Sequence, residues 1–148
     1  MAHGFRATTV IDRPVDEVFA FLADGTNDTK FSPRVQEIRK TTDGPVGVGT
    51  VFESTVKDAG MKSSRRFELT AVEAPLKIRW SERSTNAVTV PEGGYDLVAV
   101  GDDRTQVTIF NNFEGHGIGK LLVGVASRAA VKDAPAFAQR IKSAVETS

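Results

Sequence analysis

The chain has 148 residues, its 19 Lys plus Arg balance 19 Asp plus Glu, and it contains two His and no Cys. This length fits one domain, expected to span residues 1–148. The zero net charge argues against a nucleic-acid-binding protein, and the lack of cysteine excludes disulfides, thiol chemistry and cysteine-ligated metals. No apolar run is long enough for a signal peptide or a membrane span, so we expect a cytoplasmic protein.

The first 33 residues predict one strand followed by two short helices. Residues 5–11 are rich in β-forming side chains, and Pro14 then lies at a favoured first helical position. The first helix carries an apolar stripe made of Val15, Val18, Phe19 and Leu22. Residues 26–33 predict a second short helix or helical turn, and its single large apolar residue, Phe31, is expected to be buried.

Six further strands are predicted, because apolar and polar residues alternate between turn-forming stretches. They span residues 35–41, 49–57, 62–72, 76–83, 91–100 and 104–113. The polar stretch 84–89 fits either a long hairpin loop or a frayed strand end. Short connections make consecutive strands antiparallel neighbours, so the chain predicts an α+β fold with a curved, seven-stranded antiparallel sheet.

The last segment, residues 116–148, predicts one long amphipathic helix that covers the apolar face of the sheet. Its apolar stripe consists first of Ile118, Leu121, Leu122, Val125 and Ala129, and then of Ala134, Phe137, Ile141, Ala144 and Val145. The two stripes are offset at Pro135, which predicts a kink or a short break there. We expect Gly117, Gly119, Gly124 and Pro135 to weaken this helix, so that it moves to admit a ligand.

Several segments, in their order along the chain, resemble the SRPBCC superfamily. They are TTVIDRPVDEVFAFLAD, FSPRVQEI, GPVGVGTVFES, FELTAVEAPLKIRW and GYDLVAVGDDRTQVTI, followed by the long C-terminal helix. This is the helix-grip fold of START lipid-binding domains, the birch-pollen allergen and the polyketide cyclase/dehydrase group. One departure is Phe31, which stands where the family often carries tryptophan. The resemblance implies a sheet wrapped around the long helix, with a cavity between them for an apolar or amphipathic molecule.

The alternation of the strands and the spacing of the helix predict which side chains line such a cavity. They are Phe52, Ser54, Phe67, Leu69, Ile78, Trp80, Tyr95, Leu97, Ile109, Asn111, Phe113, Leu122, Val125 and Ala126. The alternative is that these side chains simply fill a solid core. Ser54, Tyr95 and Asn111 are polar on an otherwise apolar face, so each is expected to meet a protein, water or ligand partner.

Catalytic chemistry has few candidates in this sequence. Asn111, Tyr95 and Glu82 are the candidate catalytic residues; alternation places Glu82 inward, although a solvated surface position is the favoured interpretation of every strand carboxylate. His116 is interpreted as a polar loop residue before the last helix, with a role at the cavity mouth as the alternative. No metal site and no cofactor are expected, because His3 and His116 are the only histidines.

Three functions follow. The first is binding of a small hydrophobic or aromatic molecule, a lipid included, by a bacterial-type monomer or homodimer. The second is a polyketide cyclase/dehydrase-type enzyme that promotes aldol closure or water loss in the same cavity. The third is a ligand-free interaction or stress-related protein. Whether the chain is an enzyme or a carrier stays open, since both would use the same cavity walls.

Overall fold

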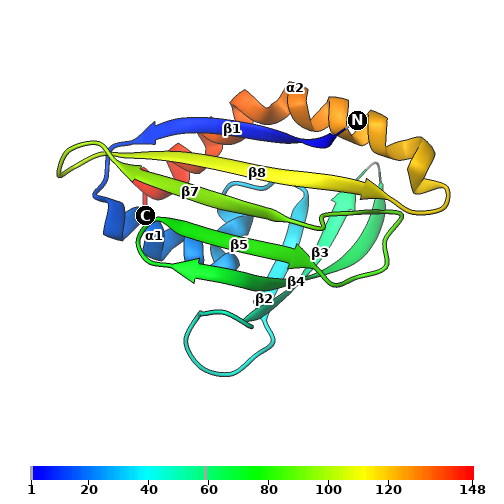
Figure 1. The fold of residues 1–148 in the computed structure, drawn as a ribbon, viewed down its shortest axis with the longest axis horizontal. Coiled ribbons are helices and arrows are strands. Elements are labelled where there is room, and N and C mark those ends of the chain that lie inside the picture. The colour runs from blue at the N-terminus through cyan, green and yellow to red at the C-terminus, as the bar shows by residue number, and fades with distance from the viewer. Residues whose placement is uncertain (1, 59) are drawn as a thin grey trace.

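The computed structural model describes residues 2–58 and 60–148, and Figure 1 shows its elements in chain order. The strands are β1 (His3–Ile11), β2 (Val35–Lys40), β3 (Val51–Asp58), β4 (Met61–Glu73), β5 (Lys77–Glu82), β6 (Val88–Thr89), β7 (Gly93–Ala99) and β8 (Thr105–Gly115). The helices are α1 (Val15–Ala23), the 3-10 helix η1 (Gly25–Lys30) and α2 (Gly119–Glu146). The expected α+β fold, with two short helices after the first strand and a long C-terminal helix, is confirmed.

The strands form one antiparallel sheet in the order β1-β8-β7-β5-β4-β3-β2. The first strand of the chain, β1, therefore pairs with the last strand, β8. Figure 1 shows β2 and β3 crossing the view steeply relative to β1 and β8, as a strongly curved sheet requires. The register shifts between Leu69 and Ala71 in β4, where an irregularity of this kind increases local bending and twist. The two-residue β6, which pairs with β8, lies in the stretch that the sequence left open between loop and strand.

The main core lies where α1, η1 and the second half of α2 meet the concave face of the sheet. Phe31 is 3% exposed, as expected for the one large apolar residue after η1. Its ring packs edge-on against Phe137 of α2 at 5.8 Å, and Phe137 in turn packs against Phe5 of β1 at 5.8 Å. Phe5 also contacts Phe113 of β8, so a row of four aromatic rings joins η1, α2, β1 and β8.

Helix α2 is continuous through Pro135, so a break at this residue is not observed. A proline removes one helical hydrogen bond, to the carbonyl four residues earlier, and here that carbonyl belongs to Val131. Pro135 is exposed and Val131 is 57% exposed, so the unused carbonyl lies on a part of the helix that water can reach. The helix therefore tolerates the proline without ending at it.

The predicted apolar stripe of α2 is correct in the second half of the helix and wrong in the first. In the second half, Ala134, Ile141, Ala144 and Val145 are buried and Phe137 packs against the core. In the first half, Ile118, Leu121, Leu122 and Val125 are 69%, 79%, 47% and 58% exposed, and Ala129 is exposed as well.

The reason lies in how closely this half of the helix approaches β1. Ser127 donates to the Gly4 carbonyl at 3.1 Å and accepts from the Gly4 amide at 2.9 Å, which fixes the rotation of the helix about its axis. The buried apolar side chain in this half is consequently that of Val123, 6% exposed, with Gly124 beside His3. Because apolar residues occupy several faces of this segment, its sequence period alone did not identify the packed face.

Candidate functional site

The concave face of the sheet carries the side chains that alternation placed inward. Seven of them are buried: Phe52, Ser54, Leu69, Ile78, Tyr95, Leu97 and Ile109. Four more are half-buried: Phe67, Trp80, Asn111 and Phe113. On α2, Ala126 is half-buried, whereas Leu122 and Val125 face solvent, contrary to the inward placement expected of them. The sheet part of the predicted wall therefore shares one face, and the helix part does so only through Ala126.

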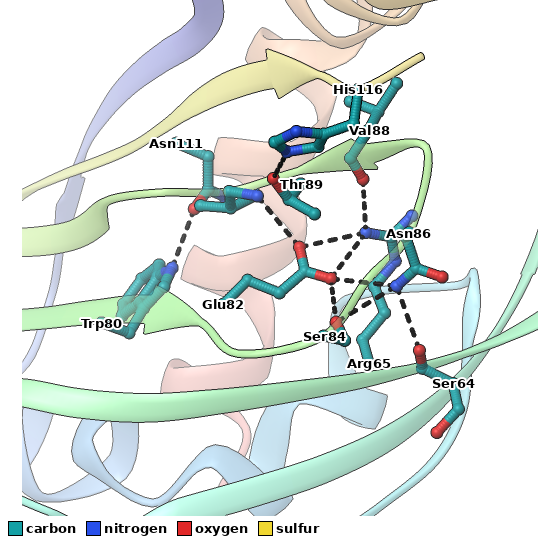
Figure 2. A network of polar contacts seen from close by, with 11 residues as sticks. Ser64, Arg65, Trp80, Glu82, Ser84, Asn86, Val88, Thr89, Asn111 and His116 are labelled. Carbon is teal, nitrogen blue, oxygen red and sulfur yellow. Dashed lines mark hydrogen bonds and ion pairs between the residues drawn. The ribbon is translucent and has the colours of Figure 1, made fainter. Parts of the chain in front are cut away.

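A hydrogen bond crosses the concave face over a glycine. Trp80 of β5 lies opposite Gly93 of β7, and Gly93 lies opposite Asn111 of β8. The Trp80 indole Nε1 donates to Asn111 Oδ1 at 2.9 Å (Figure 2). A Cβ atom at Gly93 would lie 2.0 Å from Asn111 Oδ1 and 2.3 Å from Trp80 Nε1, so only glycine leaves room for this bond. Trp80 also packs edge-on against Tyr95, with ring centroids 5.2 Å apart.

Tyr95 and Asp28 form the second polar element of the interior. Burial, together with the nearby negative charge of Asp28, raises the pKa of Tyr95 well above its ordinary value. Burial and the charge of Asp24 raise the pKa of Asp28 to about 7. Asp28 is half-buried in η1, so this short helix brings a carboxyl group toward the hydroxyl of Tyr95. Asp28 was missed by the sequence analysis, because a 3-10 helix of polar residues shows no pattern that distinguishes one carboxylate from another.

Glu82 lies at the end of β5 inside a network of donors, shown in Figure 2. Its side chain is fully buried, which overturns the solvated position favoured from the sequence and supports the alternation that pointed it inward. Arg65 Nη1 lies 3.1 and 3.2 Å from the two carboxylate oxygens, and the Val90 amide donates at 2.9 Å. Asn86 Nδ2 donates at 3.0 Å and the Ser84 hydroxyl also donates.

This network ties the segment 83–90 to the sheet. Arg65 also donates to the Val88 carbonyl at 3.0 Å, and Asn86 donates to the Ser64 carbonyl at 3.1 Å. Since its oxygens are already occupied by four groups, Glu82 acts as an anchor rather than as a free acid or base. Arg65, which the sequence analysis did not single out, makes these bonds through Nη1 alone, and its side chain is 25% exposed.

The remaining candidate residue, His116, has a hydrogen-bond partner within the protein. His116 is exposed in the connection before α2, and its Nε2 lies 2.8 Å from the Thr89 hydroxyl. Within residues 2–58 and 60–148, no three His, Asp or Glu side chains come together as a metal site. None of the helices in the described part of the chain has the length and apolar character needed to cross a bilayer.

The surface hollows of the described part of the chain include two that lie away from the space between the concave face and the first half of α2. One, of about 330 Å³, lies between η1 and the end of α2, lined by Lys30, Gln139, Arg140, Ser143, Ala144 and Thr147. The other, of about 210 Å³, lies over β2, β3 and β4, lined by Glu37, Arg39, Glu53, Ser54, Thr55 and Ser64. In this conformation α2 rests on β1 and β8.

Comparison with known proteins fits this architecture. Residues 2–146 match the family described as polyketide cyclase/dehydrase and lipid transport. The chain belongs to this family. No curated protein matches the chain in sequence.

Solved structures share the fold of this polyketide cyclase/dehydrase-family chain at low sequence identity. The Zhui aromatase/cyclase from a Streptomyces species is 18% identical, with a TM-score of 0.76 over 99% of this chain and 93% of its own. TTHA0849 from Thermus thermophilus is 16% identical, with a TM-score of 0.78 over 97% of both chains. A START superfamily protein from Mycobacterium smegmatis is 13% identical, with a TM-score of 0.72 over 98% of this chain and 95% of its own. These likenesses show the helix-grip fold that the sequence analysis expected.

Proposed function

We propose that this chain binds a small hydrophobic or aromatic molecule that carries a hydrogen-bonding group, between the concave face of the sheet and α2. The observation that carries the proposal is the state of the Tyr95 hydroxyl. Tyr95 is 4% exposed, yet its hydroxyl makes no hydrogen bond to any described residue. No fully enclosed side-chain nitrogen or oxygen in the described part of the chain lacks a partner. The hydroxyl must therefore border space that water or a ligand group can reach.

The surroundings of this hydroxyl suit a flat apolar ligand. Trp80 and Tyr95 present aromatic rings on β5 and β7, and Phe5 and Phe113 present them on β1 and β8. Ligand sites are typically apolar with a few placed polar groups, which Tyr95, Asn111 and Arg65 would supply here. A ligand of the size of the aromatic rings needs more room than the present conformation leaves, so the first half of α2 moves away from β1 and β8 on entry.

Native mass spectrometry of the purified protein, compared with its denatured mass, tests whether the interior carries a molecule. Titration with the aromatic probe 1-anilinonaphthalene-8-sulfonate then tests where binding occurs. We expect Ala126→Trp, which fills the space between α2 and the sheet, to weaken probe binding at least tenfold. The matched control Ala129→Trp lies on the exposed side of the same helix and should leave binding unchanged. Equal binding by both variants, with no bound mass, would favour the solid-core, ligand-free alternative.

The second candidate function, a cyclase/dehydrase-type enzyme, is favoured by one observation: Asp28, with a pKa raised to about 7, acts electrostatically on Tyr95. A carboxyl group that titrates near neutral pH can take a proton beside a carbonyl and return it as a hydroxyl leaves as water. Asn111 and Tyr95 would then orient the carbonyl oxygen, while Glu82 holds the wall.

An aryl β-hydroxyketone serves as the test substrate, because its loss of water produces an enone that absorbs light. General acid–base catalysis contributes roughly 100-fold or more, so Asp28→Asn should lower the rate by about that factor. The exposed turn variant Asp102→Asn is the control. If Asp28→Asn and alanine at Asn111, Tyr95 and Glu82 all leave turnover intact, the enzyme assignment is wrong and the carrier function stands alone.

A further inference from the structure

The first half of α2 has two apolar faces, of which the fold uses only one. Val123 and Ser127 face β1, as described above. Ile118, Leu121, Leu122 and Val125 lie on the opposite side of the helix, since each residue advances the helix by about 100°. With exposed fractions from 47% to 79%, these four side chains form a continuous stripe, which we name the outer stripe.

The charged side chains of residues 115–132 have one sign, and Glu114 is the acidic residue that precedes them. From Gly115 to Lys132 the sequence contains no Asp or Glu, whereas Lys120, Arg128 and Lys132 are all exposed. None of these three cations forms an ion pair with a described residue. The next carboxylate along the helix, Asp133, is held by Arg140 at 2.7 Å. At 100° per residue, Arg128 and Lys132 lie beside the outer stripe, whereas Lys120 lies on the side of Ser127. The outer stripe is therefore an apolar surface flanked by the unneutralised positive charge of Arg128 and Lys132.

This combination decides between the two partners that such a helix face could have. In a dimer of two copies, the outer stripes would bring the cations of one helix against those of the other, and like charges at close range repel. The surface of an anionic bilayer offers the opposite charge and an apolar layer beneath it. We propose that residues 118–132 dock on an anionic lipid bilayer, with the helix lying in the interface plane and the outer stripe turned toward the lipid.

The start of the helix is held in place for such docking. The His116 amide donates to the Ala87 carbonyl at 2.8 Å, and a Cβ at Gly119 would lie 1.8 Å from the same carbonyl oxygen. Close contact with the segment anchored by Glu82 thus fixes the direction in which the outer stripe faces. The end of β3 and the start of β4 lie toward the same end of the long axis as the start of α2 (Figure 1). Met61, which is paired with Asp58 and next to Lys62, is 76% exposed there.

Docking requires only this surface and does not depend on the proposed ligand. With both bilayer docking and ligand binding, the lipid surface would lie next to Leu122 and Ala126, beside the opening through which a ligand would enter. The two properties have separate tests, because vesicle binding is measured without any probe in the interior.

The experiment is co-sedimentation of the full chain with vesicles. One set is phosphatidylcholine with roughly 30 mol% phosphatidylglycerol, and the other is phosphatidylcholine alone. We expect binding to the anionic set only, and weaker binding as salt rises. Leu121→Glu should abolish it, whereas Val98→Glu, an equally apolar exposed position in β7 at 56% exposure, should not. Arg128→Gln and Lys132→Gln should each reduce affinity about fivefold.

Three outcomes would overturn the proposal. They are no binding to anionic vesicles, equal binding to neutral vesicles, and binding that Leu121→Glu leaves unchanged while its circular dichroism shows an intact fold. A dimer in sedimentation velocity that Leu121→Glu dissociates, without vesicle binding by the parent chain, would assign the outer stripe to a second copy instead.

Discussion

Asp28 is the carboxyl group whose ionisation the fold opposes most clearly. Its pKa is raised to about 7 from 3.8, mainly by burial and further by Asp24. Asp24 accepts from the Thr26 amide at 3.0 Å and from the Thr26 hydroxyl at 2.6 Å. One carboxylate is thus committed to the turn into η1, while the other remains free to titrate inside the molecule.

The stability of the protein should therefore depend on pH through Asp28. The folded protein holds this proton to about pH 7, whereas the unfolded chain releases it near 3.8. The stability that the protein has with Asp28 protonated is fully present below about pH 4, and it is lost as pH rises toward 7. Asp28→Asn should remove this decline and unfold at higher urea than the parent at pH 8, with Asp102→Asn as control. Parallel pH profiles for parent and Asp28→Asn would contradict the raised pKa.

Glu82 should be a stability residue of the wall. Removing one partner of a buried pair leaves the other uncompensated, so Glu82→Ala should lower the free energy of unfolding by about 3 kcal/mol. The control is Glu68→Ala, whose ion pair with Arg83 at 3.5 Å is largely exposed and worth less than about 1 kcal/mol. Urea unfolding of both variants measures the difference. Equal losses would mean that the network does not anchor the segment 83–90.

These residues show how far sequence patterns predict a site. Period-two alternation along β5 placed Glu82 with Ile78 and Trp80, and the structure agrees. The same pattern could not reveal Arg65 of β4 as the ion-pair partner of Glu82. Whether two side chains on different strands meet depends on the register of those strands and on the length of the side chains. Nothing in the sequence identified Asp28, since its shifted pKa arises from neighbours brought together only by the fold.

At the scale of elements, the hydrogen bond that links β5 to β8 across β7 requires glycine at position 93. Gly93→Ala would insert a Cβ between Trp80 and Asn111, so their hydrogen bond should break at a cost of about 2 kcal/mol. The chain has a single tryptophan, so its fluorescence reports this change directly. Gly47→Ala, with open space around it, is the matched control. An unchanged emission spectrum and melting temperature for Gly93→Ala would refute the role of this glycine.

The helix illustrates the opposite limit of sequence reasoning. Its existence and length followed from spacing, and the packed face of its second half was correct, because apolar residues there occupy one side only. In the first half, Leu121, Leu122, Val123 and Val125 surround the axis. The packed face is set by the hydrogen bonds of the Ser127 hydroxyl with the Gly4 backbone, which a hydrophobic period cannot reveal.

At the scale of the whole molecule, α2 divides into a strongly and a weakly buried half. The second half buries Ala134, Ala138, Ile141, Ala144 and Val145, whereas the first buries Gly119 and Val123. We expect backbone amides of residues 121–132 to exchange hydrogen faster than those of residues 137–145 and of the central strands. Exchange in residues 121–132 as slow as in β8 would show that this half does not open, and would count against ligand entry by its movement.

The pairing of consecutive strands from β2 onward was predictable, because short connections make them antiparallel neighbours. The pairing of β1 with β8, the first strand with the last, was not predicted. The position of α2 on the sheet could not be predicted from the sequence, since it depends on which of several apolar surfaces packs most closely.

The sheet has two ends, β1 and β2, and each is protected from joining the sheet of another molecule. At β1, the Ser127 hydroxyl occupies both the amide and the carbonyl of Gly4, so this part of the edge cannot template a foreign strand. At β2, the exposed side chains Gln36, Glu37 and Arg39 place polarity and charge along six residues. Such edges disfavour the strand addition that begins aggregation. If α2 opens to take up an apolar molecule, as proposed, these edges would keep the protein dispersed at high concentration while its interior is briefly exposed.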